Sequence, residues 1–217
     1  MRKTAVLTSG GMDSSILLWD LSQRAEVYPL YVQKGLSWET TELSFLSQFI
    51  GSISNGKVHP VTVLNVGAVD LYGEHWSLNG VGVPGADSSD ESVFLPGRNI
   101  LLIGLAAIWC YTNSIQEIAI GSLSANPFPD ATPKFFVDYS KLLSEALNYP
   151  ISISAPYRGQ QKDMLIKKFS HLPLNLTFTC IFPISGLHCG SCNKCSERKR
   201  AFQDSGSKDL TAYYLSN

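Results

Sequence analysis

Short apolar runs alternate along the chain with segments whose apolar residues recur at helical spacing. The apolar runs predict strands over 4–8, 26–32, 58–66, 117–121 and 151–156. The spaced segments predict helices over 14–21, 40–50, 99–110 and 132–147, the last with proline in its first turn. This alternation predicts an α/β fold, a doubly wound parallel sheet with helices on both faces. Ligands bind such sheets beyond the C-terminal ends of the strands.

Two segments fall outside the alternation. Residues 67–92 are rich in Gly, Ser and Asp and predict an irregular loop, which at this length is usually functional or mobile. Residues 177–200 hold four of the five cysteines. A chain of 217 residues suffices for one full core and is short for two. We therefore expect a main domain over 1–176, with a C-terminal zinc-binding segment over 177–217 packed on it.

Composition narrows the class of protein. Hydrophobic residues make up 44% and charged residues 16%, as in a folded globular chain. The net charge of −1 argues against nucleic acid and anionic membranes as partners. No apolar run approaches 18 residues and no signal peptide is recognisable, so we expect a cytoplasmic protein. In that compartment the cysteines indicate metal ligands or core thiols, and Cys110, on an apolar helix, is expected to be a core thiol.

The stretch "SGGMDS", Ser9–Ser14, joins the first strand to the first helix. Its glycines allow positive φ and the close approach of an anion, and the helix N-terminus adds partial positive charge. These features predict phosphate binding, although a plain strand-to-helix turn uses the same residues. Asp13, in the first helical turn, is placed to cap N–H groups or to hold a cation such as Mg²⁺.

The cysteine cluster has the spacing C-x8-C-x2-C-x2-C and consists of Cys180, Cys189, Cys192 and Cys195. Four thiolates are the ligand set of a closed tetrahedral zinc site, so the spacing predicts a structural Zn²⁺. The alternative is an iron–sulfur centre, but here the fourth ligand lies upstream and no Cys-Pro follows. His188, beside Cys189, is either a substitute ligand or a bystander.

The Ser9–Ser14 string resembles the SGGxDS loop of the PP-loop ATP pyrophosphatases, which split ATP between the α and β phosphates. This resemblance implies an adenine nucleotide alpha hydrolase-like fold and a site for ATP with Mg²⁺. It assigns the following residues to ATP binding: Leu7, Thr8, Ser9, Gly10, Gly11, Met12, Asp13, Ser14 and Ser15.

With "VFLPGRN" (93–99) and the cysteines, the chain resembles the QueC family over nearly its whole length. Further matching elements are Pro129-Asp130, Phe135-Phe136, and Arg198 or Arg200 before Ala201-Phe202. The resemblance implies a homodimeric ATP-dependent carbon–nitrogen ligase of queuosine biosynthesis. Such an enzyme adenylates 7-carboxy-7-deazaguanine, amidates it with ammonia and dehydrates the amide to the nitrile.

Residue roles follow from this resemblance. Arg98 and Lys162 are candidates for neutralising phosphate charge, so the catalytic set is Asp13, Arg98 and Lys162. The substrate-binding set is Phe94, Arg98, Asn99 and Asp130. The alternatives are a surface charge for Arg98 and a solvated helix face for Lys162. The strings "KKF" and "ERKR" are predicted to be solvated charge.

Two stretches depart from the family pattern. The chain has Tyr31-Val-Gln-Lys-Gly-Leu36 where the family usually has Tyr-Gly-Gln-Arg-His, and "LSANPFPDATPKFF" is shortened and lacks a Cys-Arg pair. Both lie near the expected sites of the base and the amine. They motivate an alternative, a QueC-like paralogue of an antiphage operon that conjugates the activated deazaguanine to a protein amine such as an N-terminus. A non-catalytic, zinc-stabilised nucleotide-binding module is the third hypothesis.

Overall fold

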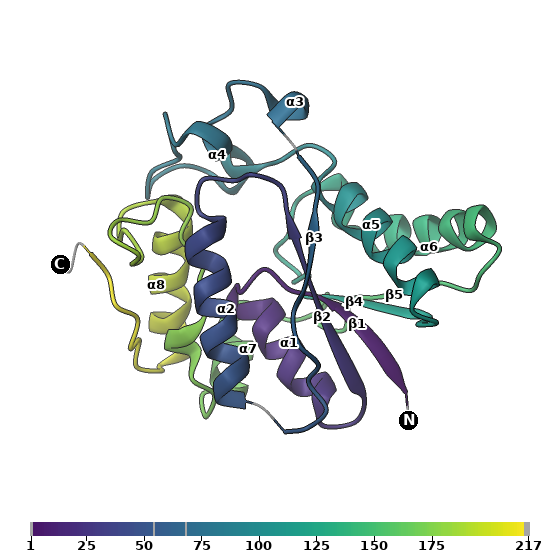
Figure 1. The fold of residues 1–217 in the computed structure, drawn as a ribbon. Helices are drawn as coiled ribbons and strands as arrows, with labels where there is room; N and C mark the ends of the chain where they lie inside the picture. Colours follow the sequence, from purple (N-terminus) through teal and green to yellow (C-terminus); the bar gives the residue numbers. More distant parts are fainter. Residues whose placement is uncertain (1, 54, 68, 215–217) are drawn as a thin grey trace.

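The computed structural model describes residues 2–53, 55–67 and 69–214. Its strands form one parallel sheet in the order β3-β2-β1-β4-β5 (Figure 1), which confirms the predicted doubly wound fold. The strands are β1 (Lys3–Leu7), β2 (Glu26–Gln33), β3 (Thr62–Asn65), β4 (Glu117–Ile120) and β5 (Ser152–Ser154). Strand β3 is shorter than predicted, because Pro60 lacks an N–H for the ladder and Val58 makes only an isolated bridge to Val27.

The helices connect the strands and follow the last one. They are α1 (Met12–Ser22), α2 (Glu39–Ile53), α3 (Val69–Tyr72), α4 (Trp76–Asn79), α5 (Arg98–Thr112), α6 (Pro133–Leu147), α7 (Lys162–Lys168) and α8 (Asn193–Ser205), with 3₁₀ turns η1 (Asp90–Val93), η2 (Pro129–Ala131) and η3 (Leu174–Leu176). Helix α6 begins as predicted, since the Thr132 side chain accepts a hydrogen bond from Phe135 N and Pro133 opens the first turn. Among the described residues, no helix has the length and apolar character needed to cross a membrane.

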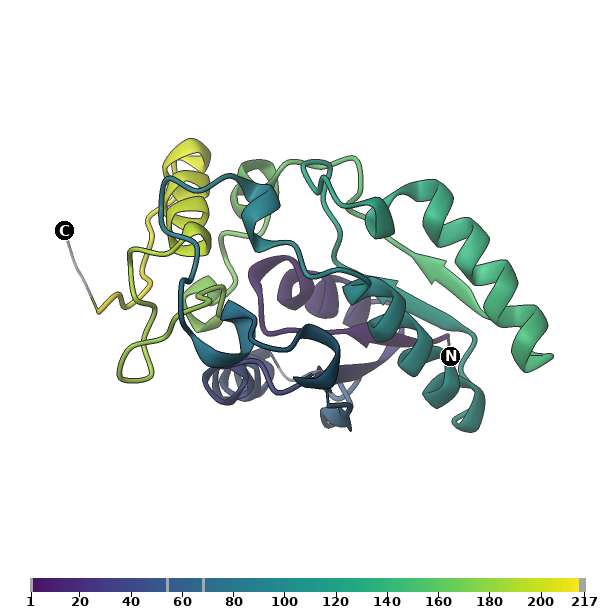
Figure 2. The ribbon, with the colours of Figure 1, turned by 90° about the horizontal axis from the view of Figure 1, so that it is seen from above.

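Side chains of the central strands alternate between two cores. Val6 and Ala119 pack with α1, α7 and α8, whereas Ala5 and Ile118 pack with α5 and α6. Figures 1 and 2 show these two groups of helices on opposite faces of the sheet. Neighbouring residues of a strand point to opposite faces of the sheet. Each face therefore has its own apolar side chains and its own layer of helices. Cys110 is fully buried in the second core, as predicted.

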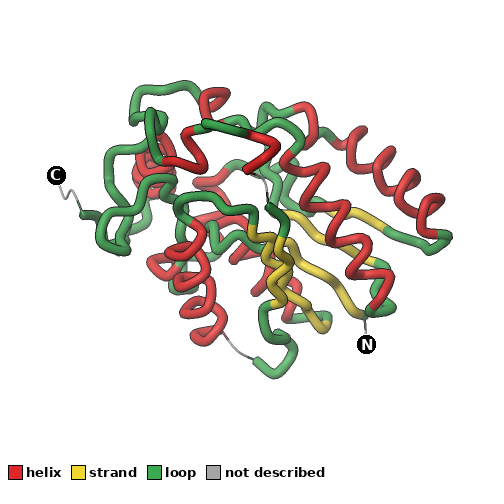
Figure 3. Tube along the Cα trace, turned by 45° about the horizontal axis from the view of Figure 1, so that its top comes forward, coloured by secondary structure: helices red, strands yellow, loops and turns green. Residues whose placement is uncertain are grey.

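A third apolar cluster lies apart from these two cores. It brings together Leu36, Trp38, Val93, Phe178 and the four clustered cysteines. Figure 3 shows loops and short helices gathered beyond one end of the sheet. The segment predicted as an irregular loop over 67–92 contains α3, α4 and the start of η1 where it is described.

The segment over 67–92 is hydrogen-bonded to the start of α8. Asn193 N donates to Pro84 O at 2.9 Å, and the Asn193 side chain donates to Ser88 O at 2.7 Å. Gly85 also forms an isolated bridge with Cys192. The long segment and the cysteine segment therefore form one layer over the end of the sheet.

The strand order changes direction between β1 and β4, which makes the crevice at their C-terminal ends the expected ligand site. Gly121, directly after β4, lies against the first turn of α1. A Cβ at this glycine would lie 2.9 Å from Ser14 N and 3.0 Å from the carbonyl carbon of Asp13. The missing side chain lets the end of β4 approach the loop that follows β1.

Candidate functional site

The loop after β1 is built to present backbone N–H groups. Gly10 has φ +71°, and Gly11 is the N-cap of α1 without a side-chain cap. The first backbone bond at the start of the helix is from Ser15 N to Gly11 O, so the N–H groups of the first turn are free for a ligand. Ser9 and Ser14 fix the turn, because Ser14 Oγ accepts from Ser9 N at 3.3 Å and donates to Gly11 O at 3.1 Å. This arrangement suits a phosphate.

Two distant segments hold this loop in place. Phe178 N donates to Gly10 O at 2.7 Å, which attaches the C-terminal segment to the loop. On another side, a Cβ on Gly10 would lie 3.0 Å from Glu42 O of α2. The close approach of α2 and the positive φ both require glycine at position 10.

A cavity of about 330 Å³ opens over the loop. Its lining includes most of the predicted site residues: Ser9, Gly11, Met12, Asp13, Ser14, Arg98, Asn99, Asp130 and Lys162. A smaller cavity of about 110 Å³ shares Ser9, Ser14, Arg98 and Asn99 with it and is also lined by Leu7 and Thr8. The remaining predicted residues, Gly10, Ser15 and Phe94, line neither of these two cavities; Ser15 is buried, and Phe94 stacks on Phe128.

Lys162 lies at the start of α7 between two carboxylates of the larger cavity. Its Nζ is 3.5 Å from Asp13 Oδ2 and in direct ion-pair contact with Glu197, which also accepts from Lys194 Nζ at 2.7 Å. Burial works to lower the pKa of Lys162, but the two carboxylates outweigh it and raise that pKa. Burial works to raise the pKa of Glu197, but Lys162 and Lys194 lower it to about 2. Lys162 and Glu197 are therefore both charged at neutral pH.

Asp13 contributes an oxygen that has no partner. Burial raises the pKa of the Asp13 carboxyl, and the ion pair with Lys162 opposes that rise. Its Oδ1 is buried and makes no hydrogen bond to the described residues. An unpaired carboxylate oxygen beside a phosphate loop fits a hard cation such as Mg²⁺.

The prediction that "ERKR" is solvated charge is wrong for its first two residues. Arg198 is 1% exposed, donates to Thr177 Oγ1, Leu174 O and Thr211 Oγ1, and lines the larger cavity. Glu197 is the partner of Lys162 described above. A charged residue persists in a protein interior where its donors are satisfied, as those of Arg198 are.

The motif at the start of α5 is held by the η2 turn. Asp130 Oδ2 accepts from Asn99 N at 2.9 Å, and the Asn99 side chain donates to Asp130 O at 2.9 Å. Gly97, the N-cap residue, has φ +70° and provides no side-chain cap, so Asp130 caps this helix from a distant part of the chain. The Nε of Arg98 is buried and has no hydrogen-bond partner within the described ranges. Asp130 thus places Arg98 at the cavity.

A second group of buried charges lines the smaller cavity. Tyr31 Oη donates to Glu42 Oε2 at 2.7 Å, and Lys34 Nζ lies 3.5 Å from Glu39 Oε1. Burial, followed by the positive charge of Arg98, lowers the pKa of Lys34 to about 8. Burial raises the pKa of Glu42 to about 7, against the opposing effect of Tyr31.

Replacing Glu42 by glutamine is expected to flatten the pH dependence of stability. The folded protein holds the Glu42 proton more tightly than the unfolded chain, so its stability falls as the pH rises from about 4.5 to about 7. Glutamine cannot ionise and still accepts from Tyr31. Urea unfolding of both proteins at pH 5 and pH 8 measures the difference. An equal loss of stability in the two proteins between these pH values contradicts the burial of an ionisable Glu42.

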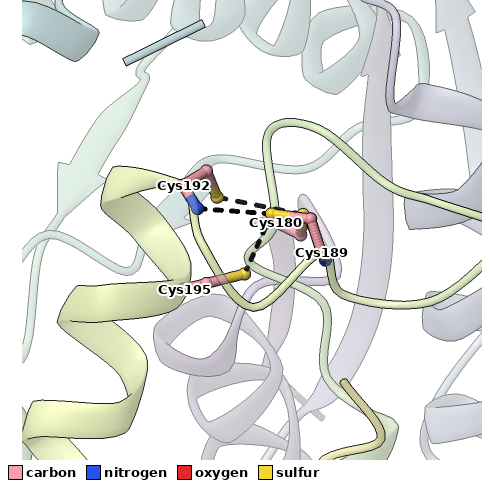
Figure 4. Close-up of side chains that lie close together, drawn as sticks. All are labelled: Cys180, Cys189, Cys192 and Cys195. Atoms are coloured by element: carbon pink, nitrogen blue, oxygen red, sulfur yellow. Dashed lines mark hydrogen bonds between the residues drawn. The ribbon is translucent and has the colours of Figure 1, made fainter. Parts of the chain in front are cut away.

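The four clustered cysteines converge on one point (Figure 4). All are buried, and their sulfur atoms lie within 4.8 Å of one another. Cys180 Sγ is 3.9 Å from Cys192 Sγ, and Cys189 Sγ is 3.8 Å from Cys195 Sγ. Cys192 is the N-cap of α8 and Cys195 lies in its first turn, so two ligands come from the helix start and two from the preceding loop. These residues form a metal-binding cluster.

The surroundings of the sulfurs suit thiolates. Backbone N–H groups donate to Cys180 Sγ from Phe182 and Cys189, and to Cys189 Sγ from Ser191 and Cys192, at 3.2–3.4 Å.

His188 lies outside this ligand set. Its Nε2 accepts from Thr179 N at 3.3 Å, and its ring packs against Phe178. Burial lowers the pKa of His188 to about 3, which keeps the ring neutral. With Nε2 occupied by the backbone, His188 is a bystander of the cluster.

Several residues of the larger cavity were not predicted. They are Trp38, Glu42, Trp76, Asp90, Asn126, Phe128, Lys194, Glu197 and Arg198. Only Arg198 had a signal in the sequence, as one of the two arginines that match the family pattern before Ala201-Phe202. The others reach the cavity through tertiary packing.

The family model described as "Queuosine biosynthesis protein QueC" matches residues 3–206. The chain is 31% identical over 207 residues to 7-cyano-7-deazaguanine synthase 1 of Desulfitobacterium hafniense (strain Y51), covering 93% of this chain and 91% of that one. It is 27% identical to the 7-cyano-7-deazaguanine synthase of Methanothrix thermoacetophila, covering 98% and 99%.

Two solved structures share the fold at lower identity. One is the U34-tRNA thiolase NcsA of Methanococcus maripaludis with its [4Fe-4S] cluster, at TM-score 0.52 and 14% identity, covering 94% of this chain and 67% of that one. The other is a predicted subunit of tRNA methyltransferase from Methanocaldococcus jannaschii, at TM-score 0.52 and 17% identity, covering 78% and 75%. At these identities the likeness concerns the fold.

Proposed function

This chain belongs to the QueC family, and from that membership we propose that it is a 7-cyano-7-deazaguanine synthase. The reaction uses ATP to convert 7-carboxy-7-deazaguanine and ammonia into 7-amido- and then 7-cyano-7-deazaguanine. The observation that carries the proposal is one cavity that joins the Ser9–Ser14 loop to Asp13, Arg98 and Lys162. That cavity combines a phosphate-binding loop with two cations, which is what breaking a phosphoanhydride requires.

The first step activates the carboxylate. A carboxylate oxygen of the substrate attacks the α-phosphorus of ATP, and the bond to the bridging α–β oxygen breaks, so that pyrophosphate leaves and an acyl-adenylate forms. The N–H groups of the first turn of α1 bind the leaving phosphates, and Lys162 faces the negative charge that develops on them. The smaller cavity, lined by Leu7 and Thr8, continues from the loop and is the proposed place of the nucleoside.

The second and third steps build the nitrile. Ammonia attacks the acyl carbon, AMP leaves with the activated oxygen, and a proton is lost to give the amide. The amide oxygen then attacks the α-phosphorus of a second ATP, pyrophosphate leaves, and one proton is lost from nitrogen to give an adenylated imidate. Loss of AMP together with the second proton from nitrogen then gives the nitrile. Each activation needs the same cations, so Arg98 and Lys162 serve both. The substrate residues are Phe94, Arg98, Asn99 and Asp130, with Asp130 acting through its cap on α5.

The metal of the cysteine cluster is proposed to be a structural Zn²⁺. Sulfurs 2.3 Å from a single tetrahedral ion are about 3.8 Å apart, which agrees with the separations of 3.8 and 3.9 Å. An iron–sulfur cluster places several atoms between its thiolates and needs a wider set. Mg²⁺ accompanies ATP and supplies charge neutralisation to its phosphates, with the unpaired Oδ1 of Asp13 as its protein ligand.

Cytoplasmic location and a homodimer complete the proposal. Apolar side chains remain exposed on α5 and α6, including Ile100, Ile108, Val137 and Leu142, and this face is the proposed contact between subunits. The two stretches that depart from the family pattern do not by themselves specify a protein amine, and the relatives are named as synthases, so conjugation to a protein in an antiphage operon is not carried forward.

The test is product analysis. Purified protein supplied with ATP, Mg²⁺, ammonium and 7-carboxy-7-deazaguanine is expected to yield the amide and then the nitrile by mass spectrometry, with two AMP and two pyrophosphate for each nitrile. Omission of ammonium is the control and is expected to stop both products. If the complete mixture forms neither amide nor nitrile, the proposed function is wrong.

A further inference from the structure

The metal-binding segment contributes side chains to the nucleotide site. Helix α8 begins at the cysteine cluster, with Cys192 as its N-cap and Cys195 in its first turn. Glu197 follows within the next turn and lines the larger cavity together with Lys194. The position of Glu197 is therefore fixed by the cluster that anchors the start of the helix.

Glu197 and Asp13 restrain Lys162 from two sides. Lys162 Nζ is 3.5 Å from Asp13 Oδ2 and in direct contact with Glu197 Oε1. A lysine ammonium has three N–H donors, so two carboxylate contacts leave one donor for a third partner. Because Lys162 lines the cavity over the Ser9–Ser14 loop, that donor is available to a phosphate bound there.

We infer that Glu197 is a positioning residue for Lys162, and that it directs the ammonium at the pyrophosphate leaving group. The inference rests on the proposed function for the identity of the reaction. As the α–β bond breaks, negative charge grows on pyrophosphate, and a cation held in place beforehand stabilises that charge without reorganising. Glu197 acts only through Lys162 and forms or breaks no bond itself.

Lys194 explains how a carboxylate can lie in a site for polyphosphate. Its Nζ donates to Glu197 Oε2 at 2.7 Å, while Lys162 holds the other oxygen. Glu197 therefore lies between two lysine ammonium groups, whose positive charge offsets the negative charge of its carboxylate.

A double-mutant cycle tests this inference. Glu197→Ala is expected to lower kcat for AMP formation about tenfold with little change in KM for ATP, because the positioned charge acts as pyrophosphate leaves. In a Lys162→Met background the same substitution is expected to have no further effect. Glu197→Gln, which retains an acceptor for Lys162, is expected to keep more activity than Glu197→Ala. Asp204→Asn, exposed on the same helix, is the matched control and is expected to match the wild type.

Pyrophosphate binding provides a readout that does not depend on the substrate. Calorimetry with inorganic pyrophosphate is expected to show weaker binding for Glu197→Ala in the wild-type background and no weakening in the Lys162→Met background. Equal fold losses in both backgrounds would show that Glu197 acts through the fold, and unchanged binding and kcat would show that it does not act at all. Either result overturns the inference. Failure of the proposed function is distinct, since it is the absence of amide and nitrile from the wild-type protein.

Discussion

Alanine in place of Asp13 is expected to lower the rate of AMP formation by roughly 10²-fold or more. The carboxylate lies at the base of the cavity in the first turn of α1, where it contacts Lys162 and keeps one oxygen unpaired. Its loss removes the proposed Mg²⁺ ligand and one of the two groups that restrain Lys162. The fold is expected to survive, because Asp13 lies beside the apolar core of α1 and not within it.

AMP release, melting temperature and metal content of the same preparation measure this effect. Glu145→Ala, exposed on α6 on the other face of the sheet, is the control and is expected to match the wild type in all three. Full AMP release by the Asp13→Ala protein would remove Asp13 from the catalytic set.

Serine in place of Cys192 is expected to release the metal and lower stability throughout the C-terminal segment. Binding of structural zinc contributes on the order of 10 kcal/mol to the folding of small zinc domains. The sheet here has two cores of its own, so a smaller share, about 3 kcal/mol, is expected to be lost. For a chain of this size that loss lowers Tm by roughly 6–12 °C.

Zinc stoichiometry and thermal unfolding measured together decide this prediction. Cys110→Ala is the matched control, because Cys110 is a buried cysteine of the α5 core outside the cluster. The Cys110→Ala protein is expected to keep a full complement of metal, although the loss of the buried sulfur lowers the stability of the α5 core. Retention of metal and Tm by the Cys192→Ser protein would contradict a four-thiolate site.

The architecture was predictable because its signals are local. Each strand and the helices α1, α2, α5 and α6 carry their own periodicity, and the alternation of the two types implies the parallel sheet. The start of β3 was misplaced because Pro60 interrupts an apolar run. Helix α8 was missed because its first turn is occupied by metal ligands and its polar residues conceal a narrow apolar stripe.

The site was predictable only where its parts are contiguous in the sequence. The Ser9–Ser14 loop and the cysteine cluster combine ligand chemistry and spacing within a few residues. Glu42 and Glu197 have no such local pattern. Each is a glutamate within a helix, and only the packing of the fold brings it to the loop. The burial of Arg198 likewise depends on Thr177 and Thr211, which come from segments on either side of α8.

The hydrogen bond from Phe178 N to Gly10 O has a consequence for biosynthesis. The loop that contains Gly10 leaves the ribosome long before Phe178, the residue that secures it, is synthesised. The sheet must therefore assemble around a loop that still lacks one of its supports. A nascent chain that ends before Phe178 has the complete glycine motif but lacks the hydrogen bond that attaches the C-terminal segment to it.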